Sequence, residues 1–99
     1  YSFSNAGGIL TITYTVSGSS NRPVPSATAQ MQSNDLELVF TDVVSDASYK
    51  ALDGKKLGGL NIETSRSGNK STYLFKNVSK EFKLYGSKSP NQVVLEIKL

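Results

Sequence analysis

Hydrophobic and polar side chains alternate most regularly in the last third of the chain. In its closing stretch apolar residues occupy one side and mostly polar residues the other: Val93, Leu95, Ile97 and Leu99 against Val94, Glu96 and Lys98. A period of two is typical of a β-strand with one buried face. Similar apolar stretches along the chain predict these strands: Ile9–Val16, Ala27–Gln32, Leu36–Phe40, Leu60–Ser65, Thr72–Val78, Lys80–Tyr85 and Gln92–Leu99.

The segments between these strands are rich in the residues that favour turns. Tyr1–Gly8 ends in a pair of glycines and is interpreted as a flexible lead-in or a turn. Ser17–Ser26 contains two prolines, which lack the backbone donor that a strand needs, so it is predicted to be a loop. Ser65–Ser71 is small and polar and is interpreted as a hairpin loop.

One segment, Asp42–Asp53, leaves two interpretations open. Ser45 or Asp46 could cap a short helix, or the whole segment could be a loop that crosses between sheets. No longer helix is indicated. About seven or eight short strands separated by frequent turns favour an all-β fold, a small β-sandwich of two short-stranded sheets, with a small barrel as the alternative.

The length of 99 residues fits one domain with a modest core. The chain opens at Tyr1 without a methionine and stops inside a strand pattern, so we expect residues 1–99 to be one module of a longer protein. Without cysteine the fold has no disulfides and must hold by packing. No apolar run approaches the roughly 18 residues of a membrane span, so we expect no direct span.

The composition excludes several kinds of catalysis. The chain has no histidine and no cysteine, which removes a histidine base and a thiol nucleophile. Carboxylates alone suit zinc poorly, and the acidic residues lack the close alternating spacing of a calcium loop. Lys55 and Lys56 lie between glycines without the spacing of a phosphate-binding loop. We therefore expect no enzymatic activity, no cofactor and no metal.

Charge is distributed unevenly along the chain. Residues 1–49 hold one arginine against four acidic residues, whereas residues 50–99 hold nine lysines and one arginine against four acidic residues. The basic half could face an anionic polymer, or its lysines could protect exposed strand edges. The alternation turns Tyr73, Phe75 and Phe82 toward the core and leaves Tyr85 as the main exposed ring, so we do not expect nucleic-acid binding.

The second half resembles an AMIN domain, the module found beside bacterial cell-wall amidases and in type IV pilus secretins. The resemblance lies in four successive runs: Leu60–Thr64, Ser71–Lys76, Glu81–Tyr85 and Ser89–Ile97. In the first half, the strand Asn34–Phe40 resembles the same closing strand more loosely. The chain departs from the family pattern at Gln92, where the family has arginine, and at Glu96, where it has aspartate; Arg66 would have to replace a further basic residue.

This resemblance implies a sandwich in the bacterial periplasm or cell envelope that binds peptidoglycan, a cell-wall glycan, without catalysis. We accordingly expect ligand binding on a flat outer sheet face, with these candidate residues: Arg66, Lys76, Lys83, Tyr85 and Lys98. The alternative is a structural or protein-docking module, immunoglobulin-like, within an envelope assembly or adhesin, with other envelope proteins as its partners.

Overall fold

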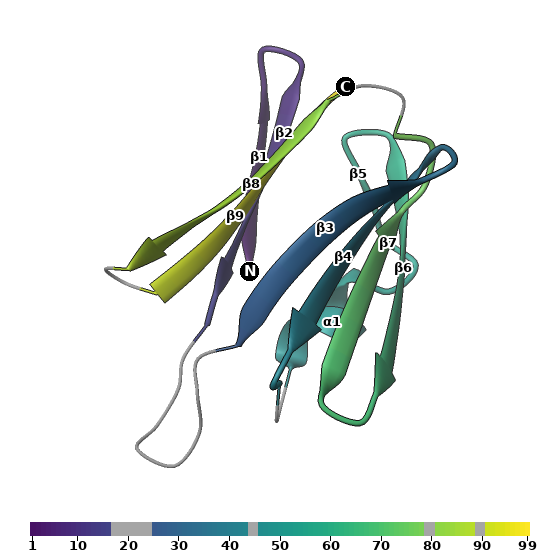
Figure 1. The fold of residues 1–99 in the computed structure, drawn as a ribbon. Helices are drawn as coiled ribbons and strands as arrows, with labels where there is room; N and C mark the ends of the chain where they lie inside the picture. Colours follow the sequence, from purple (N-terminus) through teal and green to yellow (C-terminus); the bar gives the residue numbers. More distant parts are fainter. Residues whose placement is uncertain (17–24, 44–45, 79–80, 89–90) are drawn as a thin grey trace.

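A computed structural model describes residues 1–16, 25–43, 46–78, 81–88 and 91–99. Within these ranges the chain forms two antiparallel sheets and one short helix (Figure 1). The four-stranded sheet has the order β1-β2-β9-β8 and the five-stranded sheet the order β3-β4-β7-β6-β5. The strand bounds are β1 (Ser2–Ala6), β2 (Ile9–Thr15), β3 (Ser26–Gln32), β4 (Asp35–Thr41), β5 (Lys56–Leu57), β6 (Leu60–Ser67), β7 (Lys70–Phe75), β8 (Phe82–Lys88) and β9 (Asn91–Lys98).

The two sheets pack face to face, and the predicted all-β sandwich is confirmed. The core is formed by the alternating inward residues of the inner strands, as the sequence pattern predicts. The largest fully buried side chains are Tyr73, Phe75, Leu10, Ile12, Leu36, Leu38, Leu52, Ile62, Leu95 and Ile97. At the centre, the rings of Tyr14, Phe40 and Tyr73 contact one another with centroids 5.1 to 5.7 Å apart.

The first residues of the chain form a strand, so the prediction of a flexible lead-in over Tyr1–Gly8 is wrong in part. β1 pairs with β2 in register from Ser2–Thr13 to Ala6–Ile9. The turn between them consists of Gly7 and Gly8, which both have positive φ, at 61° and 77°. A two-residue turn with positive φ at both positions matches the twist of a tight hairpin, and glycine adopts it without strain.

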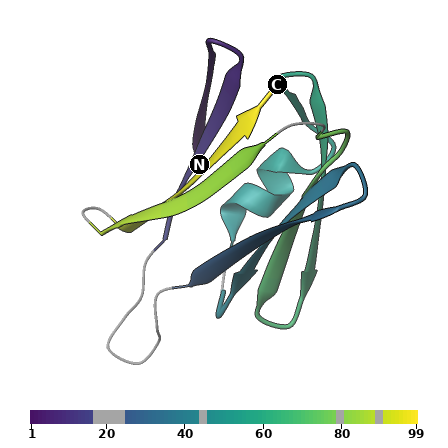
Figure 2. The same cartoon turned by 45° about the horizontal axis from the view of Figure 1, so that its top comes forward.

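The helix α1 (Ala47–Leu52) decides between the two interpretations of the central segment. Asp46 is its N-cap, with its carboxylate Oδ1 accepting from the backbone N–H of Ser48 at 2.9 Å and of Tyr49 at 3.3 Å. Ser45 lies outside the described residues. The helix, drawn as a coiled ribbon in Figure 2, packs against β6 and β7, and Leu52 is fully buried.

Several strand boundaries differ from the predicted ones. The predicted loop Ser65–Ser71 is mostly strand, because Gly68, with φ 61°, allows a two-residue turn between β6 and β7. β7 ends at Phe75 rather than Val78, since Asn77 takes a positive φ of 62° that breaks the strand. The starting residue of the predicted strand at Lys80 and most of the loop Ser17–Ser26 lie outside the described residues.

Candidate functional site

The solvent-facing side of the four-stranded sheet is the candidate binding surface. Directly opposed residues of neighbouring strands share a face, so the register fixes its composition. Thr11 and Lys83 flank Glu96, while Thr13 and Tyr85 flank Val94. We call this surface the outer face; its residues are Ile9, Thr11, Thr13, Lys83, Tyr85, Val94, Glu96 and Lys98.

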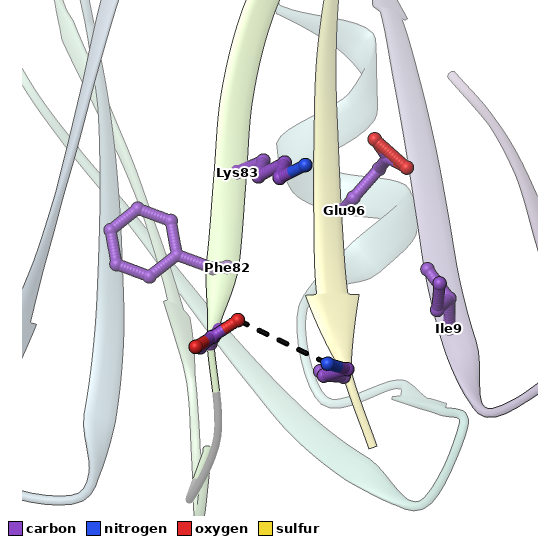
Figure 3. A pocket seen from close by; sticks show the side chains of 6 residues that line it. Ile9, Phe82, Lys83 and Glu96 are labelled. Atoms are coloured by element: carbon purple, nitrogen blue, oxygen red, sulfur yellow. Dashed lines mark ion pairs between the residues drawn. The ribbon is translucent and has the colours of Figure 1, made fainter.

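A hollow of about 160 Å³ lies at one end of the outer face (Figure 3). It is lined by Ile9, Glu81, Phe82, Lys83, Glu96 and Lys98. Lys83 and Glu96 extend to the same side of the sheet, whereas the ring of Phe82 points the opposite way, toward the core (Figure 3). The hollow therefore combines an apolar wall from Ile9 with polar groups that can bind a ligand.

Tyr85 is the exposed ring of the outer face, with 49% of its surface accessible. Its cross-strand neighbour Val94 is buried even though it points away from the core, since Tyr85 and Thr13 flank it on both sides. Partial desolvation raises the pKa of Tyr85, and the neighbouring carboxylate of Glu96 raises this pKa further. The hydroxyl is thus protonated at neutral pH and can donate a hydrogen bond.

Each lysine of the outer face lies near an acidic side chain. Lys83 is directly opposite Glu96 in the register, and Lys98 Nζ lies 4.0 Å from the carboxylate of Glu81. The two lysines therefore create little net positive field around the hollow. This arrangement suits a ligand that carries both carboxylates and amines better than a polyanion.

Lys76 does not belong to this surface, and the prediction that it shares a face with Lys83 and Lys98 is wrong. It follows β7 in the other sheet, where its Nζ lies 3.3 Å from Asp35 and 3.7 Å from Glu63. The hydrogen bond to Asp35 raises the pKa of Lys76. The physical reason is that β7 and β8 are consecutive in sequence but lie in opposite sheets.

Arg66 is also separated from the outer face, because β6 belongs to the five-stranded sheet. The alternation of β6 turns Arg66 inward, where Nη1 donates to Ser71 Oγ at 2.7 Å and Nη2 donates to the carbonyl of Val43 at 3.0 Å. Its guanidinium lies 5.7 Å from the ring centre of Tyr49. These contacts give Arg66 a structural role between α1 and the five-stranded sheet.

A buried polar cluster beside α1 was missed by sequence reasoning. Tyr73 Oη donates to Asp46 Oδ2 at 2.5 Å, while the nearby Tyr14 hydroxyl is buried and has no hydrogen-bond partner among the described residues. Burial raises the pKa of both tyrosines above their ordinary value, and Asp46 raises it further. The signal available in the sequence was an acidic residue at a possible helix start, without any indication that Tyr73 would reach it.

We expect Asp46→Ala to lower the free energy of unfolding by about 2–4 kcal/mol. The loss of a helix cap costs about 1 kcal/mol, and leaving the buried Tyr73 hydroxyl without its acceptor costs about 1–3 kcal/mol. Urea denaturation followed by circular dichroism measures the change. The exposed Glu81→Ala is the control, and an equal loss in both variants would contradict the assigned role of Asp46.

The described residues contain neither a cluster of metal-binding side chains nor a membrane-spanning helix. No group of three or more His, Cys, Asp or Glu side chains is placed there to hold a metal ion. In the same part of the chain, no helix has the length and apolar character needed to cross a bilayer.

Comparison with known proteins adds no family to this description. No family model matches the chain, and no curated protein or solved structure matches it significantly. The class defined by the described residues is thus an all-β sandwich of two antiparallel sheets, and the AMIN resemblance stays a prediction.

Proposed function

We propose that residues 1–99 form a non-catalytic binding module of the bacterial periplasm or cell envelope that contacts peptidoglycan, or a related wall polymer, through the outer face. The observation that carries the proposal is the half-exposed ring of Tyr85 on the same sheet face as a hollow bordered by Lys83, Glu96 and Lys98. The resemblance to AMIN domains supplies the compartment and the class of polymer.

The chemistry of the outer face fits a glycan that carries peptides. A tyrosine ring offers an apolar surface with a polar tip, which suits contact with a sugar ring. The hydroxyls of Thr11 and Thr13 can donate and accept hydrogen bonds along the flat sheet. Lysine and glutamate side chains can pair with the carboxylates and amines of peptide stems. Each exposed charge contact is weak, so useful affinity needs several contacts together or several modules.

We expect Tyr85→Ala to reduce binding to purified insoluble peptidoglycan at least several-fold, because the ring supplies the main apolar contact of the outer face. Co-sedimentation at physiological salt measures the bound fraction. The matched control is Lys56→Ala, an exposed lysine of β5 in the other sheet, which should bind as the parent does. Retention no greater than that of a charge-matched, unrelated protein would overturn the proposal.

A second candidate is a structural or protein-docking module, immunoglobulin-like, of an envelope assembly or adhesin. The observation that favours it is that the edge strands β1 and β3 contain no charged residue, which leaves them able to accept another strand. The adjoining sequence distinguishes the candidates: a wall hydrolase or secretin neighbour supports polymer binding, whereas repeats of similar domains support a spacer.

A further inference from the structure

The sheet edges of this domain are protected to different degrees. At the β5 side of the five-stranded sheet, residues 53–55 form hydrogen bonds with β6 beyond the short strand β5, and β5 itself carries Lys56. In the four-stranded sheet, the edge strand opposite β1 is β8, which carries Lys83. Charged side chains at an edge oppose pairing with another chain. β1 and β3 lack this protection, since neither contains a charged residue.

β1 is the more open of these two edges. All five of its residues are exposed, whereas β3 half-buries Ala27 and Ala29 against the core. Phe3 is 51% exposed and Tyr1 is 39% exposed, and their rings stack with centroids 6.4 Å apart. Phe3 lies opposite the buried Ile12, so it is on the inward side of the sheet, where the five-stranded sheet does not cover it.

The backbone of β1 directs specific groups to the open edge. In a two-residue hairpin the residues that flank the turn form a hydrogen-bonded pair, here Ala6 and Ile9. Hydrogen-bonded pairs alternate along an antiparallel ladder, so Ser4 and Ser2 also bond to β2. The N–H and C=O groups of Phe3 and Asn5 therefore point away from β2. Among the described residues, β1 pairs only with β2.

We propose that β1 pairs antiparallel with β1 of a second copy of this chain, with Phe3 opposite Phe3 across a two-fold axis. In this register the residues whose N–H and C=O groups point away from β2 lie opposite each other in the two copies, with Tyr1 of one copy opposite Asn5 of the other. It joins the two four-stranded sheets into one continuous sheet of eight strands. The two Phe3 rings become direct cross-strand neighbours, and each Tyr1–Phe3 stack extends into a cluster of four rings.

A second copy is favoured as the occupant because the edge is complementary to itself. A two-fold interface brings the same patch of both chains together, so it tolerates no like charges at its centre. The net charge of each chain is +3, yet Ser2–Ala6 contributes no charged side chain to the contact. Five residues make a small interface compared with the roughly 1,600 Å² of a standard one, so we expect a dissociation constant that is micromolar or weaker.

This pairing is independent of polymer binding, and it would strengthen such binding where it occurs. A continuous eight-stranded sheet presents the outer faces of both copies on the same side. Two weak sites on one rigid sheet bind a repetitive polymer with an effective concentration that single modules lack.

Sedimentation equilibrium of residues 1–99 from roughly micromolar to millimolar concentration tests the proposal against the expected affinity range. We expect reversible dimers in the parent chain and at least tenfold weaker association in Phe3→Lys, which places two charges opposite each other. Asn5→Pro should act similarly, because it removes an outward N–H while leaving the β1–β2 bonds in place. Thr28→Lys on the β3 edge is the matched control and should associate as the parent does. Circular dichroism confirms that each variant is folded.

A cross-link fixes the register. The chain has no cysteine, so Phe3→Cys carries a single thiol that should oxidise to a disulfide dimer faster than Thr28→Cys does. A parent chain that stays monomeric at millimolar concentration would overturn the proposal. So would dimers that persist unchanged in Phe3→Lys, or that are lost in Thr28→Lys instead.

Discussion

Raising the pH above about 10 is expected to unfold this domain, with a loss of about 5 kcal/mol of stability by pH 12. Tyr14 and Tyr73 are 3% and 1% exposed, and burial raises the pKa of each above its ordinary value near 10. Above pH 10 the unfolded chain therefore loses two phenolic protons that the folded chain keeps. Their contribution to stability is fully present below pH 10 and falls as the pH rises toward the folded-state pKa values.

The magnitude follows from linkage. Each tyrosine lowers the free energy of unfolding by about 1.36 kcal/mol per pH unit once its unfolded form is ionised, so both together give about 2.7 kcal/mol per unit. Native domains are stable by only about 5–15 kcal/mol, so this loss is large. Urea denaturation at stepped pH, with tyrosinate absorbance as a second probe, measures the slope.

Two variants and one control assign the slope to these residues. Tyr14→Phe and Tyr73→Phe should each reduce the alkaline slope by about half. Tyr14→Phe should not destabilise the domain at neutral pH, because it removes a buried hydroxyl that has no partner in the part of the chain that the structure describes. Tyr1→Phe changes an exposed ring and should leave the slope unchanged. If the free energy of unfolding fell with pH equally steeply in all variants, the alkaline loss of stability would come from other groups, such as the lysines.

Truncating Phe75 to alanine is expected to lower the free energy of unfolding by about 3–5 kcal/mol. Phe75 is fully buried at the centre of the five-stranded sheet, directly between Leu36 of β4 and Ile62 of β6. Its removal takes away buried apolar surface and leaves a cavity in a core that cannot fully collapse. Urea denaturation monitored by circular dichroism measures the change.

The adjacent residue provides the matched control for this substitution. Leu74 has the opposite orientation on β7 and is only half-buried, so Leu74→Ala should cost clearly less. A loss in Leu74→Ala equal to that in Phe75→Ala would contradict the assignment of inner and outer faces. A fully unfolded Phe75→Ala would still agree with the expected range, given the marginal stability of small domains.

The faces of most strands could be predicted from alternation alone. Leu10, Ile12, Leu95 and Ile97 are buried as their spacing predicts, and Tyr85 is exposed. This works because successive side chains of a strand point to opposite sides whichever strand lies next to it. The glycine pair at Gly7–Gly8 was a hairpin signal whose first strand, short and without buried residues, lacked a hydrophobic pattern of its own.

The candidate site was predictable only in part. Lys83, Tyr85 and Lys98 do share the outer face, but Glu81 and Glu96 balance the charge there, and Ile9 joins from the far end of the sequence. Whether these residues bind a ligand stays a prediction. Arg66 lies away from the outer face because β6 belongs to the five-stranded sheet, and within that sheet its side chain points inward to Ser71.

By itself the sequence determined an all-β domain without disulfides, the residues that form its core, and the ring that remains in water. The tertiary structure decided which strands are neighbours: it places β2 beside β9, separates Lys76 from Lys83, and brings Asp46 to Tyr73. The physical reason is that side-chain alternation is a local property of each strand, whereas backbone hydrogen bonds between strands are nearly the same for any sequence. Sheet membership therefore depends on how all the buried faces pack together.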